Sequence, residues 1–276
     1  MVGAMMLPAS LPTIRMVDAA TTFMKEPAMS GTSSTTDPPT GFDPTRRTAL
    51  VAGILYLVTF LASIPAVFLL GPVLNDPGYV VGRGADTQVR AGAFLDLVNA
   101  LACIGTAVAL FSVVRREHEG LALGFVTTRM FEAAVIAIGV VSILAVVTLR
   151  EDGAANDESA ALVPVGQALV AVRDWTFVLG PGMAGFNALL LGTLLYRSRL
   201  IPRVIPAIGL VGGPIYLSAV AAIVLGVTAA GGLWQGIGGL FMFVWELLLA
   251  LWLTFRGFDR SAPIVQAAIA DARSGA

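Results

Sequence analysis

The sequence predicts an all-α protein, a polytopic bundle of six transmembrane helices with both termini in the cytoplasm. Apolar residues make up 57% of the chain and charged residues 13%, and the mean hydropathy is +0.84, which is outside the range of soluble domains. The apolar residues fall in runs too long for strands or ordinary core helices. One run, 121–150, carries Arg129 and Glu132 well inside it. An ionised side chain at such depth costs at least about 2.5–3.5 kcal/mol, so it normally faces partners inside a bundle.

Two polar segments are expected to flank the membrane domain, which covers residues 46–258. Residues 1–45 are rich in Ser, Thr, Pro and Met, without a sustained apolar run, and are predicted to form a disordered cytoplasmic tail. They have neither the basic start nor the apolar core of a signal peptide. Residues 259–276 are predicted to form a short cytoplasmic tail.

Each of the six spans is long enough to cross a hydrocarbon core of about 30 Å. Pro65 predicts a kink in the first span, and Gly180-Pro181-Gly182 predicts a break in the fourth. The spacing Gly209-x-x-x-Gly213 predicts close helix packing in the fifth. Turn signals after the first span suggest a loop with a short surface helix. The expected spans are residues 48–71, 91–114, 121–149, 173–196, 204–227 and 233–255.

The arginines near the spans predict the orientation. One side carries nine of them: Arg46, Arg47, Arg115, Arg116, Arg197, Arg199, Arg203, Arg256 and Arg260. The other side carries four: Arg83, Arg90, Arg150 and Arg173, the last placed at an interface beside Trp175. Cytoplasmic flanks are enriched in Arg and Lys, so both termini are expected in the cytoplasm, and an even number of spans agrees with termini on the same side.

Six polar residues inside the spans form a candidate intramembrane network. At about 1.5 Å per residue, Arg129, Glu132, Asn187 and Glu246 reach similar depths near the membrane midplane. Asp96 and Asn99 share a helical face with Cys103 and extend the network outward. One arginine and up to three carboxylates cannot all ionise comfortably at low dielectric, so we expect at least one carboxylate to be protonated or neutralised by a cation. The network therefore comprises Asp96, Asn99, Arg129, Glu132, Asn187 and Glu246.

Two readings of this network are open. It can be structural, because interhelical hydrogen bonds of about 0.6–2 kcal/mol fix helix register. It can also bind a small molecule or a cation. A water-accessible cavity that reaches Glu246 would favour binding, and a dry, fully paired network would favour the structural role.

Other functions are not expected. The chain lacks H-E-x-x-H, G-x-S-x-G, phosphate-loop and Cys/His signatures, so no catalytic, cofactor-binding or metal-binding residues are predicted, and the chain is not expected to be an enzyme. The basic residues are scattered, which argues against a nucleic-acid partner. The single cysteine, Cys103, excludes an intrachain disulfide, and the single histidine, His118, lies in a polar turn.

Several stretches carry a resemblance to a known family. They are Ala52-Gly53-Ile54-Leu55-Tyr56-Leu57, Phe94-Leu95-Asp96-Leu97, Arg129-Met130-Phe131-Glu132-Ala133, Leu191-Gly192-Thr193-Leu194-Leu195-Tyr196-Arg197-Ser198, Ile201-Pro202-Arg203 and residues 246–253. Over most of Arg46 to Phe258 the chain resembles the bacterial membrane-protein family known as domain of unknown function 4386. That family often has a histidine in the fourth span, where this chain has Asn187, so a role that needs a titrating imidazole is weakened.

The resemblance implies a six-helix integral protein of the bacterial cytoplasmic membrane and suggests that Asp96, Arg129, Glu132 and Glu246 are family-pattern positions. It assigns no activity. With the lipid bilayer as the expected partner, the first hypothesis is a structural or scaffold-like membrane protein. The alternative is a small transporter or ligand-binding protein that uses an intramembrane carboxylate for a small-molecule or cation ligand. An intramembrane enzyme is the remote alternative.

Overall fold

A computed structural model describes residues 44–82, 84–153 and 159–267. The predicted N-terminal tail, apart from its last two residues, lies outside this range, as does the end of the predicted C-terminal tail from residue 268. Across the described ranges the chain forms helices and no strand. The all-α class expected from the composition is therefore confirmed.

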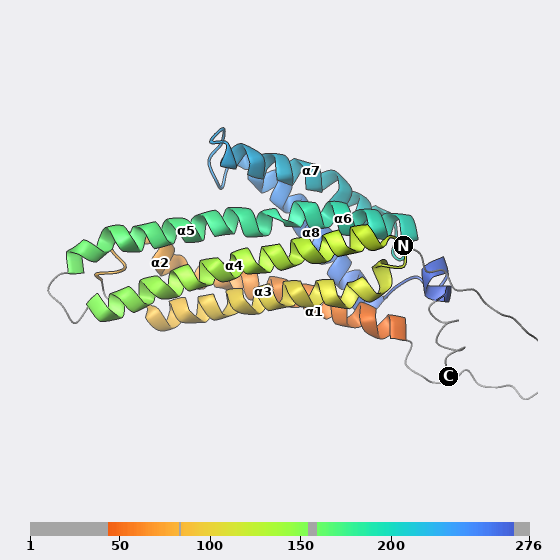
Figure 1. Cartoon of the computed structure of the whole chain (residues 1–276), viewed down its shortest axis with the longest axis horizontal. Helices are drawn as coiled ribbons and strands as arrows, with labels where there is room; N and C mark the ends of the chain where they lie inside the picture. Colours follow the sequence, from red (N-terminus) through yellow and green to blue (C-terminus); the bar gives the residue numbers. More distant parts are fainter. Residues whose placement is uncertain (1–43, 83, 154–158, 268–276) are drawn as a thin grey trace, which may run out of the picture. The chain divides into compact units, whose positions relative to one another are not determined.

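Six helical segments are long and apolar enough to cross a membrane, which confirms the predicted number of spans (Figure 1). The bounds of the last span, α8, agree with the predicted ones. In each of the other five spans, at least one end differs from the predicted position by two residues or more. Seven helices make up these six spans, because α5 and α6 together form the fourth. The helices are α1 (Pro44–Leu69), α3 (Asp86–Val114), α4 (Glu119–Gly153), α5 (Val163–Gly182), α6 (Ala184–Ser198), α7 (Val204–Val224) and α8 (Leu233–Phe255). A short helix, α2 (Gly71–Asn75), and a 3-10 turn, Ser159–Leu162, lie in the connections.

The six spans form a ring that follows the chain order. Helix α1 packs on α3, α3 on α4, α4 on both α5 and α6, α6 on α7, and α7 on α8, which returns to α1. Arg46 closes the ring, since its guanidinium donates hydrogen bonds to the carbonyl oxygens of Leu253 at 3.2 Å and Thr254 at 2.8 Å. The start of α1 therefore lies beside the end of α8. The first and last spans thus have their outer ends at the same end of the bundle, as an even number of spans requires.

Glycines allow the helices to approach closely at two positions of the predicted spacing in α7. A Cβ added at Gly209 would lie 2.7 Å from the Trp245 ring in α8, and one added at Gly213 would lie 2.9 Å from the carbonyl oxygen of Gly185 in α6. The Gly209-x-x-x-Gly213 spacing therefore packs α7 against its two neighbours within the same chain.

The fourth span differs most from expectation. It begins at Val163 rather than at Arg173, with Pro164 in the first turn, where a missing N–H costs nothing. Arg173 lies about three turns into the helix and is buried, so its expected interfacial position is corrected. The predicted break is present: α5 ends at Gly182, one residue after Pro181, and α6 begins at Ala184. Pro181 has no N–H and cannot donate a helical hydrogen bond.

The ends of the ring differ in composition. Arg46, Arg115, Arg197, Arg203 and Arg256 lie at helix ends on one side, which we call the arginine-rich end, where Arg197 also pairs with Glu117 at 3.3 Å. The opposite end has a smaller polar cluster around Asp86. Among the described residues this distribution follows the one predicted from the sequence, apart from Arg173; Arg83 lies outside the described ranges.

At the end opposite the arginine-rich one, Asp86 links a loop to two spans. Its carboxylate accepts hydrogen bonds from the Tyr79 hydroxyl at 2.7 Å and from Arg150 Nε at 2.6 Å. Burial raises the pKa of the Tyr79 phenol above its ordinary value, so the hydroxyl stays protonated and keeps donating. The loop of residues 76–82 is therefore tied to α3 and α4.

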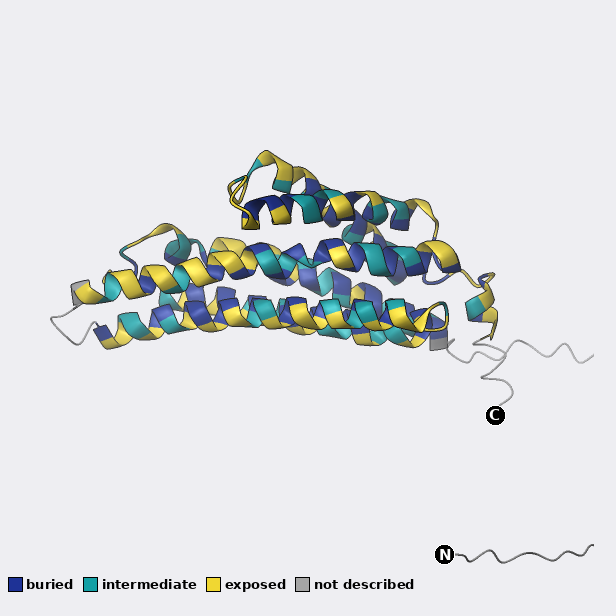
Figure 2. Cartoon of the chain, turned by 45° about the horizontal axis from the view of Figure 1, so that its top comes forward, coloured by how far each residue is buried: buried dark blue, intermediate teal, exposed yellow. Residues whose placement is uncertain are grey.

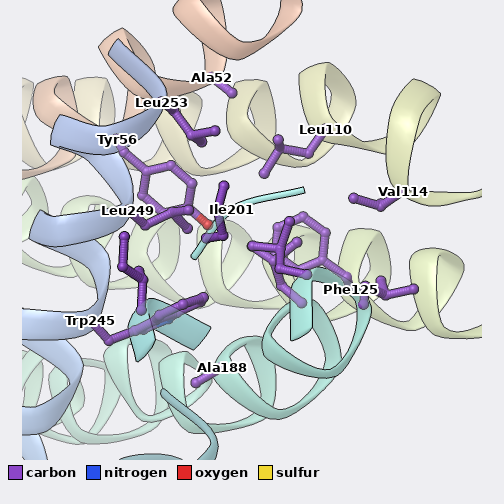
Figure 3. Close-up of a cluster of buried hydrophobic side chains, with 14 of the residues drawn as sticks. Ala52, Tyr56, Leu110, Val114, Phe125, Ala188, Ile201, Trp245, Leu249 and Leu253 are labelled. Carbon is purple, nitrogen blue, oxygen red and sulfur yellow. The ribbon is translucent and has the colours of Figure 1, made fainter. Parts of the chain in front are cut away.

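A cluster of packed apolar side chains starts at the arginine-rich end and reaches past the middle of the ring, and Figure 3 shows some of its members. A second buried apolar cluster, which includes Leu70 and Ile143, lies toward the opposite end. Figure 2 shows buried and exposed faces alternating around each helix, and the exposed faces carry large apolar residues such as Leu61, Phe94 and Leu240. Such outward apolar faces are those that lipid chains cover. The core cluster includes Tyr56, Leu110, Phe125, Ala188, Trp245, Leu249 and Leu253.

Candidate functional site

A buried arginine joins two spans at the centre of the ring. Arg129 of α4 donates from Nη1 to Glu132 Oε2 at 3.0 Å and from Nη2 to Glu246 Oε1 at 2.9 Å. Glu132 lies one turn along the same helix, and Glu246 comes from α8. The sequence spacing predicted the first pair, and the structure brings Glu246 to the same guanidinium.

Asn187 ties α6 into this group. Its Nδ2 donates to Glu132 Oε2 at 2.8 Å, and its Oδ1 accepts a hydrogen bond from the Thr128 hydroxyl at 2.5 Å. Thr128 was not a candidate from the sequence, because a threonine inside an apolar helix usually bonds to its own helix backbone. Its hydroxyl oxygen also lies 3.1 Å from the Gly124 carbonyl oxygen, an alternative acceptor for its single proton.

Helix α3 reaches the arginine through sulfur. Arg129 Nη1 lies 3.6 Å from Cys103 Sγ, and that thiol lies 3.9 Å from Asn99 Oδ1. The Arg129 guanidinium also sits over the Tyr56 ring, 5.0 Å from its centroid, in cation–π geometry. Asn99 therefore joins the group through Cys103. We call Asn99, Cys103, Thr128, Arg129, Glu132, Asn187 and Glu246 the central network.

Asp96 has a partner of its own. Its Oδ2 accepts a hydrogen bond from Arg173 Nη2 at 2.7 Å, and both residues are 6% exposed. Arg173 also lies over the Phe177 ring, 5.0 Å from its centroid. The expectation that Asp96 extends the central network is therefore corrected: it forms a second buried ion pair between α3 and α5. Sequence reasoning missed this pair because Arg173 stands next to Asp174 and Trp175 and resembles a helix end.

The two charged groups differ in balance. Asp96 and Arg173 neutralise each other, whereas Arg129 faces both Glu132 and Glu246. If every group in the central network ionises, it carries one excess negative charge. Excess charge in a low-dielectric interior favours the uptake of a proton or a cation.

A cavity of about 250 Å³, the central cavity, adjoins the network. All six spans contribute to its wall, and its charged lining residues are Arg129, Glu132 and Glu246. The Glu246 side chain is 15% exposed, against 7% for Glu132 and 2% for Arg129. Glu246 is therefore the most accessible charged group of the network.

The central cavity extends away from the arginine-rich end. Its wall runs along α1 from Thr59 to Val67 and along α8 from Glu246 back to Gly239, whereas the apolar core occupies the other half of both helices. Pro181, at the break in the fourth span, is also part of the wall. The network is thus closed on one side by packed side chains and open on the other to the cavity.

Metal-ligand clusters are not found in the described part of the chain, where no group of three His, Cys, Asp or Glu side chains could hold an ion. His118 instead accepts a hydrogen bond at Nδ1 from the Leu121 backbone N–H at 3.2 Å, in the first turns of α4.

No curated protein and no solved structure matches the chain. A family model, Domain of unknown function (DUF4386), matches residues 51–257, which contain the central network, the Asp96–Arg173 pair and the central cavity. The match covers most of the chain and agrees with the six-span membrane character of the structure. The protein therefore belongs to the DUF4386 family.

Proposed function

We propose that this protein binds a small organic cation in the central cavity, and that the cation exchanges with a proton on Glu246. We place it in the bacterial cytoplasmic membrane with both termini in the cytoplasm. The observation that carries the proposal is a cavity whose wall holds one arginine and two carboxylates, so that one carboxylate has no balancing cation within the wall. A protonated amine or a proton supplies the missing charge.

The remaining wall suits a cation with short apolar groups. Phe60, Phe177, Tyr216 and Phe243 line the cavity, and Phe60 and Phe243 pack edge to face with centroids 5.2 Å apart. Aromatic faces attract cations by about 0.5–2 kcal/mol, depending on desolvation. A volume of about 250 Å³ is below that of most drug-sized sites, which points to a ligand of a few heavy atoms.

Glu246 is the better candidate for exchange. Glu132 Oε2 accepts hydrogen bonds from both Arg129 and Asn187, whereas Glu246 accepts one from Arg129 through Oε1. Because Glu246 accepts fewer hydrogen bonds and is more exposed, less interaction free energy is lost when it is protonated or when a ligand displaces one of its contacts.

The position of the cavity supports transport across the membrane as the setting for this exchange. Arginine enrichment favours the arginine-rich end as the cytoplasmic one, so the central cavity would lie in the outer half of the bundle. The interrupted helix at Pro181 borders the cavity, and interrupted helices commonly line the binding sites of transporters.

A structural role is the second candidate, because the network's hydrogen bonds join α4 to α6 and to α8. Thermal unfolding of the full chain in detergent, from pH 5 to 8, separates the two. Tetramethylammonium, ethylammonium and Na⁺ are added to the wild type, to Glu246→Gln and to Glu151→Gln, a control in an exposed ion pair.

Binding to the folded state raises the melting temperature by mass action. The proposal expects an ammonium-dependent rise in the wild type and the control that grows with pH, as protons compete less, and no rise in Glu246→Gln. Equal responses in all three proteins, with Glu246→Gln simply less stable, would instead assign the network a structural role.

A further inference from the structure

A second site, independent of the central cavity, lies at the arginine-rich end. A groove of about 580 Å³ runs between the turn that joins α6 to α7 and the segment that follows α8. We propose that this groove, the basic groove, binds the phosphate of an anionic phospholipid. Its polar lining residues are Arg199, Arg203, Trp252, Arg256 and Asp259.

Charge is the first argument. Three guanidinium groups face one carboxylate, and that carboxylate already accepts hydrogen bonds from the backbone N–H and the hydroxyl of Ser261 at 2.9 and 2.7 Å. The Arg203 guanidinium lies over the Tyr196 ring at 5.0 Å, and that of Arg256 over the Trp252 ring at 6.0 Å. A guanidinium group stacked on an aromatic ring can still donate parallel N–H hydrogen bonds to two oxygens of a phosphate.

The indole of Trp252 is the second argument. Its Nε1–H is buried and has no hydrogen-bond partner, although the residue lines the groove. A buried donor without an acceptor is costly. An oxygen of a bound lipid that comes within hydrogen-bond distance of Nε1 would satisfy this donor.

The backbone at Arg199 is the third argument. Arg199 ends α6 in the left-handed region, with φ 56°, and is the one residue other than glycine with a positive φ in the described chain. Glycine or asparagine normally takes this position, because a Cβ is strained there. An arginine in this strained conformation, beside the groove, points to a use for its side chain.

The groove is held in place on both sides. The Asp259 backbone N–H donates to the Leu200 carbonyl oxygen at 2.8 Å, which connects the α6–α7 turn to the segment after α8. Leu200, Ile201 and Phe258 are buried beneath it. The three arginines are therefore carried by segments that are joined to each other.

A lipid, rather than a free phosphate, is favoured by what borders the groove. Val204 and Phe255 are next in sequence to Arg203 and Arg256, and they are 72% exposed each. Side chains this apolar and exposed suit contact with acyl chains, while the adjacent arginines reach the headgroup. The groove would thus hold a lipid at its phosphate with the chains along α7 and α8.

The test measures lipid binding to the full chain in detergent by native mass spectrometry. The probes are phosphatidylglycerol, phosphatidylcholine with the same acyl chains, and inorganic phosphate as a competitor. The groove variant carries Arg199→Gln, Arg203→Gln and Arg256→Gln, and the control carries Arg47→Gln, Arg115→Gln and Arg197→Gln, which removes as many charges from exposed positions at the same end.

We expect phosphatidylglycerol to bind the wild type more tightly than phosphatidylcholine, and the groove variant to lose about a hundredfold in affinity, at roughly a factor of five per arginine. The control should stay within about threefold of the wild type, since its charges lie outside the groove. Equal losses in the two variants, or an unchanged groove variant, would overturn the proposal. Competition by inorganic phosphate at concentrations near those of the lipid would overturn the lipid assignment.

Two single substitutions guard against a folding artefact. Arg199→Gly relieves the backbone strain, so it should keep or raise the melting temperature while weakening phosphatidylglycerol binding. Trp252→Phe keeps an aromatic side chain, although a smaller one, and removes the N–H, so it should weaken binding as well. If both variants bind phosphatidylglycerol as the wild type does, the groove is not the lipid site.

Discussion

Removing one member of the Asp96–Arg173 pair should be far more damaging than removing both. The two side chains are 8% and 7% exposed and form a hydrogen bond of 2.7 Å, so water screens them little. For unit charges about 4 Å apart and an effective dielectric constant of about 20, the attraction is about 4 kcal/mol. A single substitution loses that attraction and leaves the other charge buried without a partner, which typically costs about 3–5 kcal/mol.

The perturbations are Asp96→Leu, Arg173→Met and the double substitution. Each single change should lower the free energy of unfolding by about 3–5 kcal/mol. The free energy of unfolding of the double variant should lie within about 2 kcal/mol of that of the wild type, because two apolar side chains of similar size leave no buried charge without a partner. The coupling energy should therefore exceed about 3 kcal/mol.

Reversible unfolding in mixed detergent micelles, followed by circular dichroism, gives these free energies. The exposed pair Arg90 and Glu151, 50% and 42% exposed, is the matched control, and its coupling should be below about 1 kcal/mol. Losses below about 1 kcal/mol in both single variants at Asp96 and Arg173, or a double loss equal to the sum of the single losses, would refute the assignment of a buried, unscreened pair.

Three further predictions address packing, charge and pH. Gly238→Ala places a Cβ 2.7 Å from the α7 backbone and should lower the free energy of unfolding by about 1–3 kcal/mol, whereas Gly236→Ala on the same helix meets nothing within 4 Å and should be neutral or stabilising. Cys103 lines the central cavity, so a small cationic thiol reagent should label it faster than an anionic reagent of equal size. Glu246→Gln should reduce the ratio of the cationic to the anionic labelling rate, and mass spectrometry of the labelled chain measures both rates. Hydrogen bonds from Ser261 lower the pKa of Asp259 below its ordinary value of about 4. The turn that these hydrogen bonds form should be intact above about pH 4 and should open only as the pH falls through the lowered pKa. The NMR signal of the Asp259 carboxyl carbon would follow this opening.

The fold was largely readable from the sequence because length and hydropathy alone define a span. The bounds of α8 match because Trp234 and the glycines before it mark one end, and the arginine after Phe255 marks the other. The start of the fourth span differs from the prediction because Arg173, although charged, lies inside the span rather than at the edge of the membrane. Its true partner, Asp96, is 77 positions away in the sequence, and no local pattern reveals such a pair.

The central network was predicted in part. Arg129 and Glu132 are neighbours on any helix, so their pairing follows from spacing alone. The contact between Arg129 and Glu246 depended on matching their depths in two spans, which the rise per residue allows. The cavity beside them depends on how side chains from six spans leave space, and the basic groove depends on the conformation of a turn, so neither is encoded in a periodic pattern.

The closure of the ring between the first and last spans has a consequence for how the protein is made. A ribosome delivers α8 last, so a nascent chain with five spans contains Arg129 and Glu132 but not Glu246. At that stage the buried arginine and its neighbour on α4 balance each other, so a five-span intermediate carries no excess charge at this site. The excess carboxylate arrives only with the helix that closes the ring and docks against Arg46. The order of synthesis thus keeps the unbalanced charge out of the membrane until the arginine that receives it is already in place.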